Sequence, residues 1–231
     1  MRAYGLVLLL IVGATVAQAD LLWDNFLTPN PAVDGGFDRN SYFSSERNAA
    51  VEDTWATDDV VFTHDVVVQG IKWAGGRDPR WTYSVEVIIL KEQNQTYAPL
   101  AGFPLAVPTY QVTGTFGSFY GFQTYNGYVE LPDTPLGPGH YYIGVRLVSG
   151  PTGQGDGRNV ALTTGYGQIN GQTMGLVRPG PPPYYDWIFI NQYPGEPATD
   201  YAFQVYGIPE PTGLALLALG LLPQLRRRFV R

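Results

Sequence analysis

The residues with the plainest capacity for chemistry are acidic side chains gathered around one tryptophan. Asp53, Asp58 and Asp59, together with Glu52, stand on either side of Trp55. Carboxylate oxygens are the hard ligands that calcium prefers, so Asp53, Asp58 and Asp59 are candidate calcium ligands on a loop that leads into a strand. Their spacing does not match an EF-hand loop. A solvated, acidic entrance to a strand accounts for the same residues, and the sequence favours that interpretation.

Aromatic side chains form the second candidate group, because exposed rings stack on the apolar faces of sugars. The chain has five Trp and 16 Tyr. Asn126-Gly127 is a strong hairpin signal, which predicts tyrosines at a hairpin tip. The candidate glycan-binding residues are Trp55, Tyr125, Tyr128, Tyr184, Tyr185 and Trp187. The alternative for each ring is core packing or a cross-strand aromatic pair, and Trp73 is expected in the core.

Hydrolysis of a glycan requires two carboxylates at a set separation. Glu86 and Glu130 are the best placed, since both fall in predicted strands. Alternation along a strand also predicts that both face solvent. The chain contains neither a Gly-x-Ser-x-Gly elbow nor a His-Glu-x-x-His motif. It has no cysteine and only two histidines, which excludes thiol nucleophiles and multi-histidine zinc sites. These observations favour a non-catalytic domain.

Strands must position these residues. Many Tyr, Val and Thr between Gly and Pro punctuation predict strands and turns. Alternation is clearest in residues 82–90, and a shift in alternation at Gly70 predicts a bulge in the strand at 65–74. Further strands are predicted at 60–63, 122–131, 140–149, 185–190 and 201–206, and residues 21–23 are expected to pair near the last strand.

The order of these strands predicts one all-β domain at residues 20–207. Several strands joined by turn signals, with no long helical pattern, are typical of a two-sheet β-sandwich, here of jelly-roll type. An immunoglobulin-like sandwich is the second choice. Residues 28–45, 150–157 and 178–183 are predicted loops, the last in polyproline II conformation.

The first 19 residues have the layout of a secretory signal peptide. Arg2 precedes a compact apolar stretch, and Ala17-Gln18-Ala19 is a small-x-small cleavage site. Signal peptidase is therefore an expected partner, and cleavage after Ala19 leaves Asp20 as the new N-terminus.

The last 24 residues, 208–231, combine a rigid break, an apolar run and a cationic end. The prolines in Pro209-Glu210-Pro211 lack N–H donors and favour an extended chain. The leucine-rich run that follows favours a helix, although Pro223 shortens it. By the positive-inside rule, the closing arginines favour the cytoplasmic side of the inner membrane; they are Arg226, Arg227, Arg228 and Arg231.

This tail resembles the PEP-CTERM sorting signal of exported Gram-negative surface proteins. The resemblance covers only the tail and has its three parts in the expected order. It implies an exosortase-like partner that cuts at Pro209, Glu210 and Pro211 and removes the hydrophobic tail helix. It also implies a transient inner-membrane intermediate, followed by the cell surface or the extracellular polysaccharide matrix. Pro223 departs from the unbroken apolar helix of that family.

Removing both terminal signals makes the remaining domain more acidic. The whole chain has a net charge of −6, whereas residues 20–207 keep nine Lys and Arg against 19 Asp and Glu, a net charge of −10. Such a domain is not expected to bind nucleic acid. The expected function is an exported surface or matrix protein with a structural or binding domain for polysaccharide or a matrix protein. A carbohydrate-binding module is the first alternative, and a glycoside hydrolase or lyase is the second.

Overall fold

The computed structural model describes the chain in segments that together form an all-β structure. The described residues are 19–26, 37–44, 46–48, 52–78, 83–93, 96–119, 122–149, 159–164, 171–172, 174–179, 185–189 and 199–209. Within them, the strands form two sheets, here called sheet A and sheet B. The prediction of an all-β fold is confirmed for these residues.

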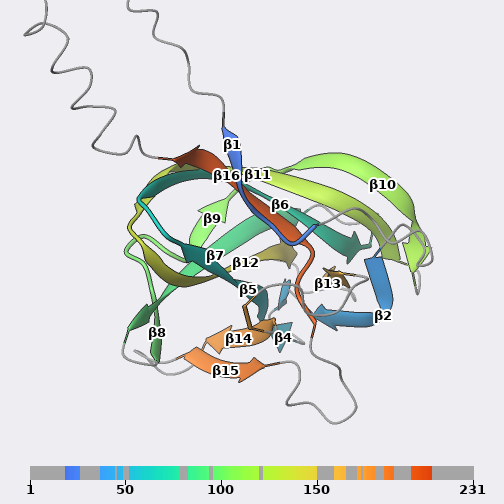
Figure 1. Ribbon diagram of the computed structural model, residues 1–231. Helices are drawn as coiled ribbons and strands as arrows, with labels where there is room; N and C mark the ends of the chain where they lie inside the picture. The colour runs from blue at the N-terminus through green and yellow to red at the C-terminus, as the bar shows by residue number, and fades with distance from the viewer. Residues whose placement is uncertain are drawn as a thin grey trace, which may run out of the picture.

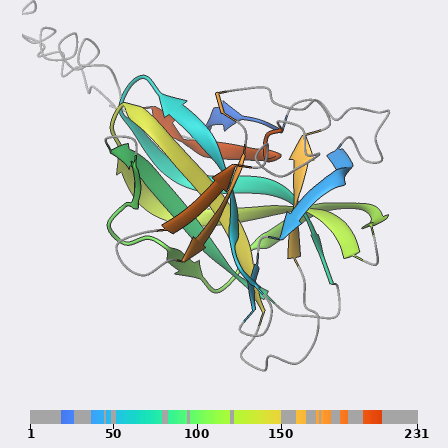
Figure 2. The ribbon, with the colours of Figure 1, turned by 90° about the horizontal axis from the view of Figure 1, so that it is seen from below.

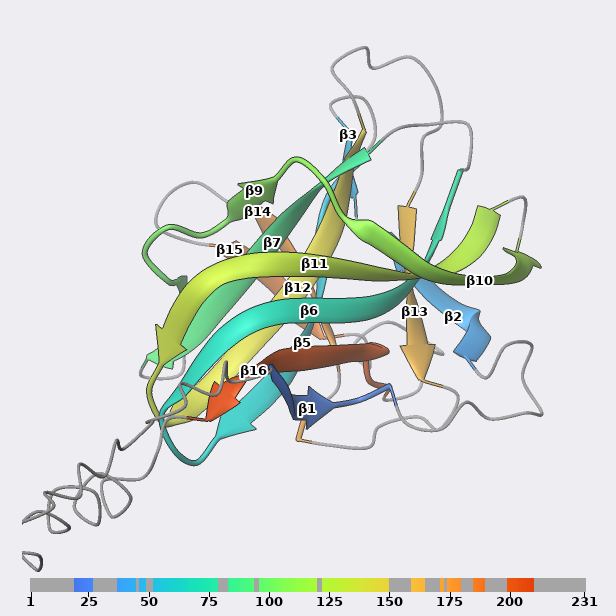
Figure 3. The same ribbon diagram turned by 90° about the horizontal axis from the view of Figure 1, so that it is seen from above.

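Sheet A brings the first and last described strands together. Five of its strands lie side by side in the order β1 (Asp20–Asp24), β16 (Phe203–Pro209), β6 (Val66–Arg77), β11 (Phe122–Leu136) and β10 (Gln111–Phe119). Figure 3 shows them from above. Two more strands, β13 (Asn159–Thr164) and β2 (Phe37–Ser44), join through the pairing of β13 with β6.

Sheet B forms the lower layer in Figure 1 and is seen from below in Figure 2. Its path runs through β15 (Tyr185–Phe189), β14 (Gly175–Pro179), β5 (Trp55–Phe62), β12 (Gly139–Ser149), β3 (Glu46–Asn48) and β4 (Glu52–Asp53). The strand β7 (Tyr83–Gln93) pairs with β12, and it also pairs with β8 (Thr96–Pro99) and β9 (Leu105–Val107). The β3–β12 pair is parallel, and the other pairs of the described strands are antiparallel.

One hydrophobic core lies between the two sheets. Side chains on alternate positions of a strand point to opposite faces, so the central strands contribute alternate residues to this core. Val85, Val87 and Ile89 of β7 enter it from sheet B, and Ile71 and Trp73 of β6 enter it from sheet A. Burial of these apolar side chains is the main force that holds the layers together. The expectation that Trp73 is a core residue is confirmed.

The strand β6 contains the predicted irregularity at Gly70. Its register with β11 and with β16 shifts next to this residue, and Gln69 has no Cα partner in either ladder. Val68 and Ile71 both reach the core as a result, whereas Gly70 faces outward. The extra residue therefore keeps Val66 and Val68 on the same inner face as Ile71 and Trp73.

The predicted hairpin at Asn126-Gly127 is wrong. Both residues lie inside β11 and pair with Ala74 and Trp73 of β6. A Cβ atom on Gly127 would overlap the indole ring of Trp73. The glycine at this position makes space for a large core ring, so the dipeptide reflects packing and not a turn.

Several predicted strands agree with the structure, whereas parts of the predicted loops are strands. The strands predicted at 82–90, 122–131 and 140–149 correspond to β7, β11 and β12. Part of the predicted loop 28–45 is β2, and part of the predicted loop 178–183 belongs to β14, while the predicted loop 150–157 lies outside the described residues. Asp58 and Asp59 lie within β5, not on a loop before it.

The two ends of the described domain are neighbours. β1 pairs with β16 in antiparallel register, and Asp20 stands opposite Gly207. Both strands lie together at the top of Figure 1. The prediction that residues 21–23 pair near the last strand is confirmed.

Candidate functional site

The outer face of sheet A carries a pair of half-buried tyrosines. Tyr128 on β11 and Tyr206 on β16 flank β6 from its two sides, because β6 lies between these strands. Their ring centroids are 6.0 Å apart and the ring planes meet at 81°. Edge-to-face geometry of this kind is favourable between aromatic rings. The two rings, here called the tyrosine pair, meet edge to face, so that their planes form a corner on the outer face of the sheet.

Gly70 determines how Tyr128 lies. A Cβ atom built on Gly70 would be 2.9 Å from both Cε2 and Cζ of Tyr128, so the outer half of the ring occupies the space that a side chain on β6 would fill. Tyr128 therefore lies across β6, close to the backbone. Tyr206 stands opposite Gly70 in the β6–β16 ladder, and its ring contacts the Tyr128 ring in an edge-to-face geometry.

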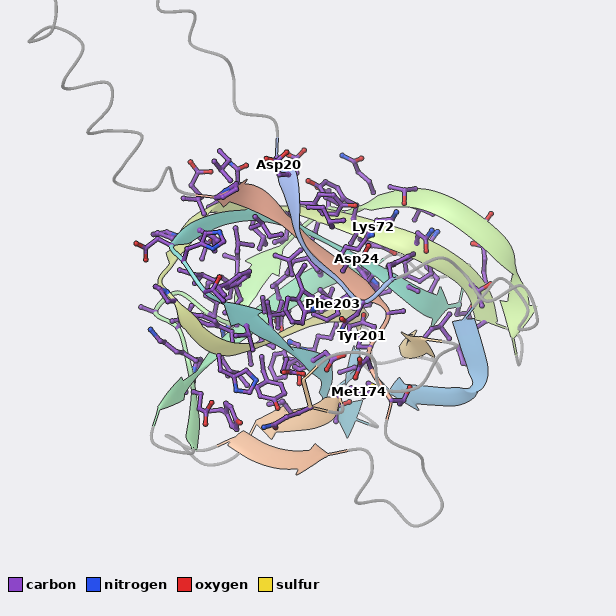
Figure 4. The ribbon with its side chains drawn as sticks, viewed as in Figure 1. Asp20, Asp24, Lys72, Met174, Tyr201 and Phe203 are labelled. Carbon is purple, nitrogen blue, oxygen red and sulfur yellow. The ribbon has the colours of Figure 1, made fainter. Side chains whose placement is uncertain are left out.

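Polar groups surround the tyrosine pair. The Tyr206 hydroxyl donates to Gln204 Oε1 at 2.8 Å, and Gln204 Nε2 donates to Asp24 Oδ1 at 3.0 Å. Partial burial raises the pKa of both tyrosines; Glu130 raises that of Tyr128 further, and Asp24 that of Tyr206. Asp24 is labelled in Figure 4. The corner thus offers aromatic surface next to hydrogen-bonding groups and two carboxylates.

Lys72 is the cation on the same face. It is half-buried and stands opposite Tyr128 and Gln204 in the two ladders. Its Nζ lies 4.8 Å from the centroid of the Phe26 ring, an attractive cation–π contact. Figure 4 labels Lys72 in the upper layer of the molecule.

The outer face of sheet B carries a histidine between two carboxylates. His140 Nε2 lies 3.1 Å from Asp59 Oδ2, and His140 Nδ1 lies 2.7 Å from Glu92 Oε2. Each ring nitrogen of His140 thus lies within hydrogen-bond distance of a carboxylate oxygen. Burial raises the pKa of Asp59, whereas its hydrogen bond from Gln172 N and the charge of His140 lower it. Since both nitrogens face carboxylates, the cluster links β12 to β5 and β7.

A buried ion pair lies on the same face of sheet B. Arg146 Nε donates to Glu86 Oε2 at 2.8 Å, and the guanidinium stacks 3.2 Å from the centroid of the Trp55 ring. Trp55 is only 2% exposed. Glu86 is thus held by a cation, and Trp55 is covered by it.

Asp58 points the other way, into the space between the sheets. Its Oδ2 accepts from Tyr201 N at 2.6 Å and from Asn25 Nδ2 at 3.0 Å, and its Oδ1 accepts from Asp59 N at 2.9 Å. Burial raises the pKa of Asp58 well above its ordinary value, and the neighbouring Asp200 and Asp59 add to the effect. Asp58 therefore ties β5 to the segments that follow β1 and precede β16.

Two of the predicted calcium ligands, Asp58 and Asp59, point to different faces of sheet B. Asp58 faces the interior and Asp59 the outer face of sheet B, while Asp53 lies in β4. Neighbouring residues of a strand point to opposite faces, so Asp58 and Asp59 do not converge on one ion. No group of three metal-ligating side chains occurs among the described residues.

Only part of the predicted aromatic set reaches the surface. Tyr125 is fully buried and accepts a hydrogen bond from Trp73 Nε1 at 3.1 Å, and Trp55 is buried under Arg146. Neither ring is available to a sugar, because Tyr125 points to the core and Trp55 is covered. Tyr185 and Trp187 belong to β15, and Tyr184 lies outside the described residues. Tyr128 is the predicted residue that the structure places in an aromatic corner.

The proposed carboxylate pair for hydrolysis is not brought together either. Glu86 belongs to β7 of sheet B and Glu130 to β11 of sheet A, and both point away from the shared core. The two carboxylates thus lie on opposite sides of the molecule.

Sequence reasoning missed Tyr206 and Gly70 as members of the site. Both were in predicted strands, but their proximity depends on β16 lying next to β6 although the two are far apart in sequence. The one available signal was the shifted alternation around Gly70, which marked the bulge without indicating its use.

The sorting residues lie at or beyond the ends of the described domain. Ala19 directly precedes β1, and Pro209 is the last residue of β16. The other predicted sorting residues fall outside the described residues; they are Glu210, Pro211, Arg226, Arg227 and Arg228. No helix within the described segments is long and apolar enough to cross a membrane.

Comparisons with family models, with curated proteins and with solved structures gave no match for this chain.

Proposed function

We propose that this chain is an exported surface or matrix protein whose domain is a non-catalytic binding module, with its binding face on the outer side of sheet A. The single observation that carries the binding role is the tyrosine pair, since a half-exposed aromatic corner with adjacent polar groups is typical of ligand sites. We also propose that the two sheets form a sandwich of jelly-roll type.

The positions of the terminal strands support export with processing at both ends. β1 begins at Asp20, directly after the predicted signal-peptide cleavage site at Ala19. β16 ends at Pro209, the first residue of the predicted sorting site. Both cuts would then leave the described strands in place, apart from the last residues of β16.

Two described side chains that could take part in acid–base chemistry are already engaged, which supports a non-catalytic role. Both nitrogens of His140 face carboxylates, and Glu86 is held by Arg146. A general base or acid requires a free position within reach of substrate. These side chains are instead used to join strands.

Fractionation of the expressed full-length chain tests export and sorting. In a Gram-negative host that carries an exosortase-like enzyme, we expect extracellular protein that starts at Asp20 and lacks the arginine cluster by mass spectrometry. Changing Pro209, Glu210 and Pro211 to Ala should keep the protein in the inner membrane with its tail. Cytoplasmic protein that still begins at Met1 would overturn export, and exported protein with an intact tail would overturn sorting.

A further inference from the structure

We infer that the tyrosine pair binds a polysaccharide whose sugar units carry free ammonium groups. This inference rests on the proposed binding role of the outer face of sheet A and names the ligand class and the residues that recognise it. Three observations carry it: the shape of the corner, the charge around it, and the groups that are already engaged.

The shape suits a pyranose ring. Tyr128 lies across β6 because Gly70 has no side chain, so it offers a ring face close to the sheet. Tyr206 meets it at 81° and forms the second side of the corner. A sugar ring that stacks on one tyrosine can contact the other with its edge, which uses the apolar C–H face of the sugar and the large apolar area of the aromatic rings.

The charge around the corner favours a cation over an anion. Glu130 is exposed and stands opposite Gly70 in the β6–β11 ladder, beside Tyr128 on the outer face. Asp24 lies on the other side, close enough to raise the pKa of Tyr206. Glu130 thus lies beside Tyr128 and Asp24 near Tyr206, while Lys72 on the same face is held over the Phe26 ring. The domain as a whole is strongly acidic. A polymer of uronic acids would be repelled, whereas an ammonium group gains favourable interactions with these carboxylates.

The contacts of the neighbouring charged groups assign recognition of the ammonium group to Glu130. Lys72 stacks on Phe26, and Asp24 accepts from Gln204 Nε2 and from Phe26 N at 2.8 Å. Glu130 is exposed on the rim next to the ring that forms the floor of the corner. The assignment is therefore stacking by Tyr128 and Tyr206, with charge recognition by Glu130.

The experiment uses the full-length chain in a mild detergent and measures binding to four oligosaccharides by calorimetry. The probes are oligomers of glucosamine, N-acetylglucosamine, glucose and a uronic acid. We expect the glucosamine oligomer to bind most tightly and the uronate oligomer not to bind. The preference for glucosamine over its acetylated form should shrink at about 0.5 M salt, because screening weakens exposed charge interactions.

Variants separate stacking from charge. Tyr128→Ala should weaken binding of glucosamine and N-acetylglucosamine oligomers about tenfold or more, whereas Tyr128→Phe, which keeps the ring, should retain it. Glu130→Gln should lower only the preference for the ammonium form, by about threefold, as for a rim charge. Tyr97→Ala on sheet B is the matched control and should leave affinity unchanged.

Gly70→Ala tests the geometry directly. The new Cβ displaces the flexible far end of Tyr128, so the protein should fold, keep every aromatic atom and still lose affinity. Thermal unfolding of each variant checks that it is folded.

The outcomes are decisive for the inference. Equal binding of acetylated and free amino sugars, or tighter binding of uronates, would overturn the charge assignment. Unchanged affinity in folded Gly70→Ala and Tyr128→Ala variants would overturn the site. Export is measured separately. An exported and processed protein that binds none of the four probes would therefore overturn this inference and leave the proposal of export and sorting unaffected.

Discussion

Asp58 provides the most demanding test of how the two sheets are held together. Its carboxylate accepts hydrogen bonds from Tyr201 N and Asn25 Nδ2, two buried groups at one end of the β1–β16 pair. Asp58→Ala removes the acceptor of both. A buried donor that loses its acceptor costs about 1–3 kcal/mol, so we expect the free energy of unfolding to fall by about 3 kcal/mol under acidic conditions.

The pH dependence of this loss follows from the direction of the pKa shift. Burial raises the pKa of Asp58 in the folded state above the ordinary value of 3.8. The folded protein then holds a proton that the unfolded chain has already released. The associated stability is fully present below the ordinary pKa and is lost as pH rises through the folded value, at up to about 1.4 kcal/mol per pH unit.

Urea unfolding of the wild type, Asp58→Ala and Asp58→Asn, measured from about pH 4 to about pH 8, tests both effects. The wild type should lose stability with rising pH more steeply than Asp58→Ala, so the cost of the substitution should shrink toward high pH. Asp58→Asn keeps one acceptor oxygen and should fall between the two. A loss below about 1 kcal/mol at low pH, or parallel pH profiles for wild type and Asp58→Ala, would refute the reasoning.

Two further substitutions test packing and charge. Gly127→Ala places a Cβ against the Trp73 ring and should lower the free energy of unfolding by about 1–3 kcal/mol in urea. The control is Gly137→Ala, whose Cβ would be 3.5 Å from its nearest atom, and it should be nearly neutral. Equal effects of the two substitutions would contradict the packing argument. Arg146→Ala removes the cation from buried Glu86 and should destabilise the domain by about 3–5 kcal/mol. The same substitution uncovers an indole ring, so tryptophan fluorescence should shift to the red, and an unchanged spectrum with unchanged stability would contradict it.

Alternation predicted the strands that supply the core but not the partners of their outer faces. In the middle of β7 and β12, every second residue is apolar and enters the space between the sheets, so these strands could be recognised from the sequence. The short strands β3, β4, β8 and β9 were not predicted. They have two to four residues each, too few for a period to show.

The candidate residues were harder to place, because burial depends on partners far away in the sequence. Trp55 was a candidate glycan-binding ring with core packing as the alternative, and the structure covers it with Arg146 from β12. Tyr125 was a candidate for the flank of a hairpin tip with core packing as the alternative, and it belongs to the inner face of β11. Asp58 and Asp59 are adjacent in sequence and act on opposite faces of one strand, which the loop prediction concealed.

The tyrosine pair also could not be predicted in full, because it depends on the order of the strands in sheet A. Tyr128 was a candidate from the sequence, and the irregularity at Gly70 was predicted as a bulge. Their relation to Tyr206 required the strand order β16–β6–β11, which places residues from both ends of the domain around one glycine. No local pattern records such an order.

The pairing of Asp20 with Gly207 also bears on how this domain can be rearranged. Paired strands lie about 5 Å apart, so a few residues suffice to join the two ends of the domain. New ends opened at an exposed connection, such as Ala101-Gly102, would give a circular permutant with the same two sheets. For the same reason the domain can be inserted into a surface loop of a host protein, since it enters and leaves the host chain at neighbouring points.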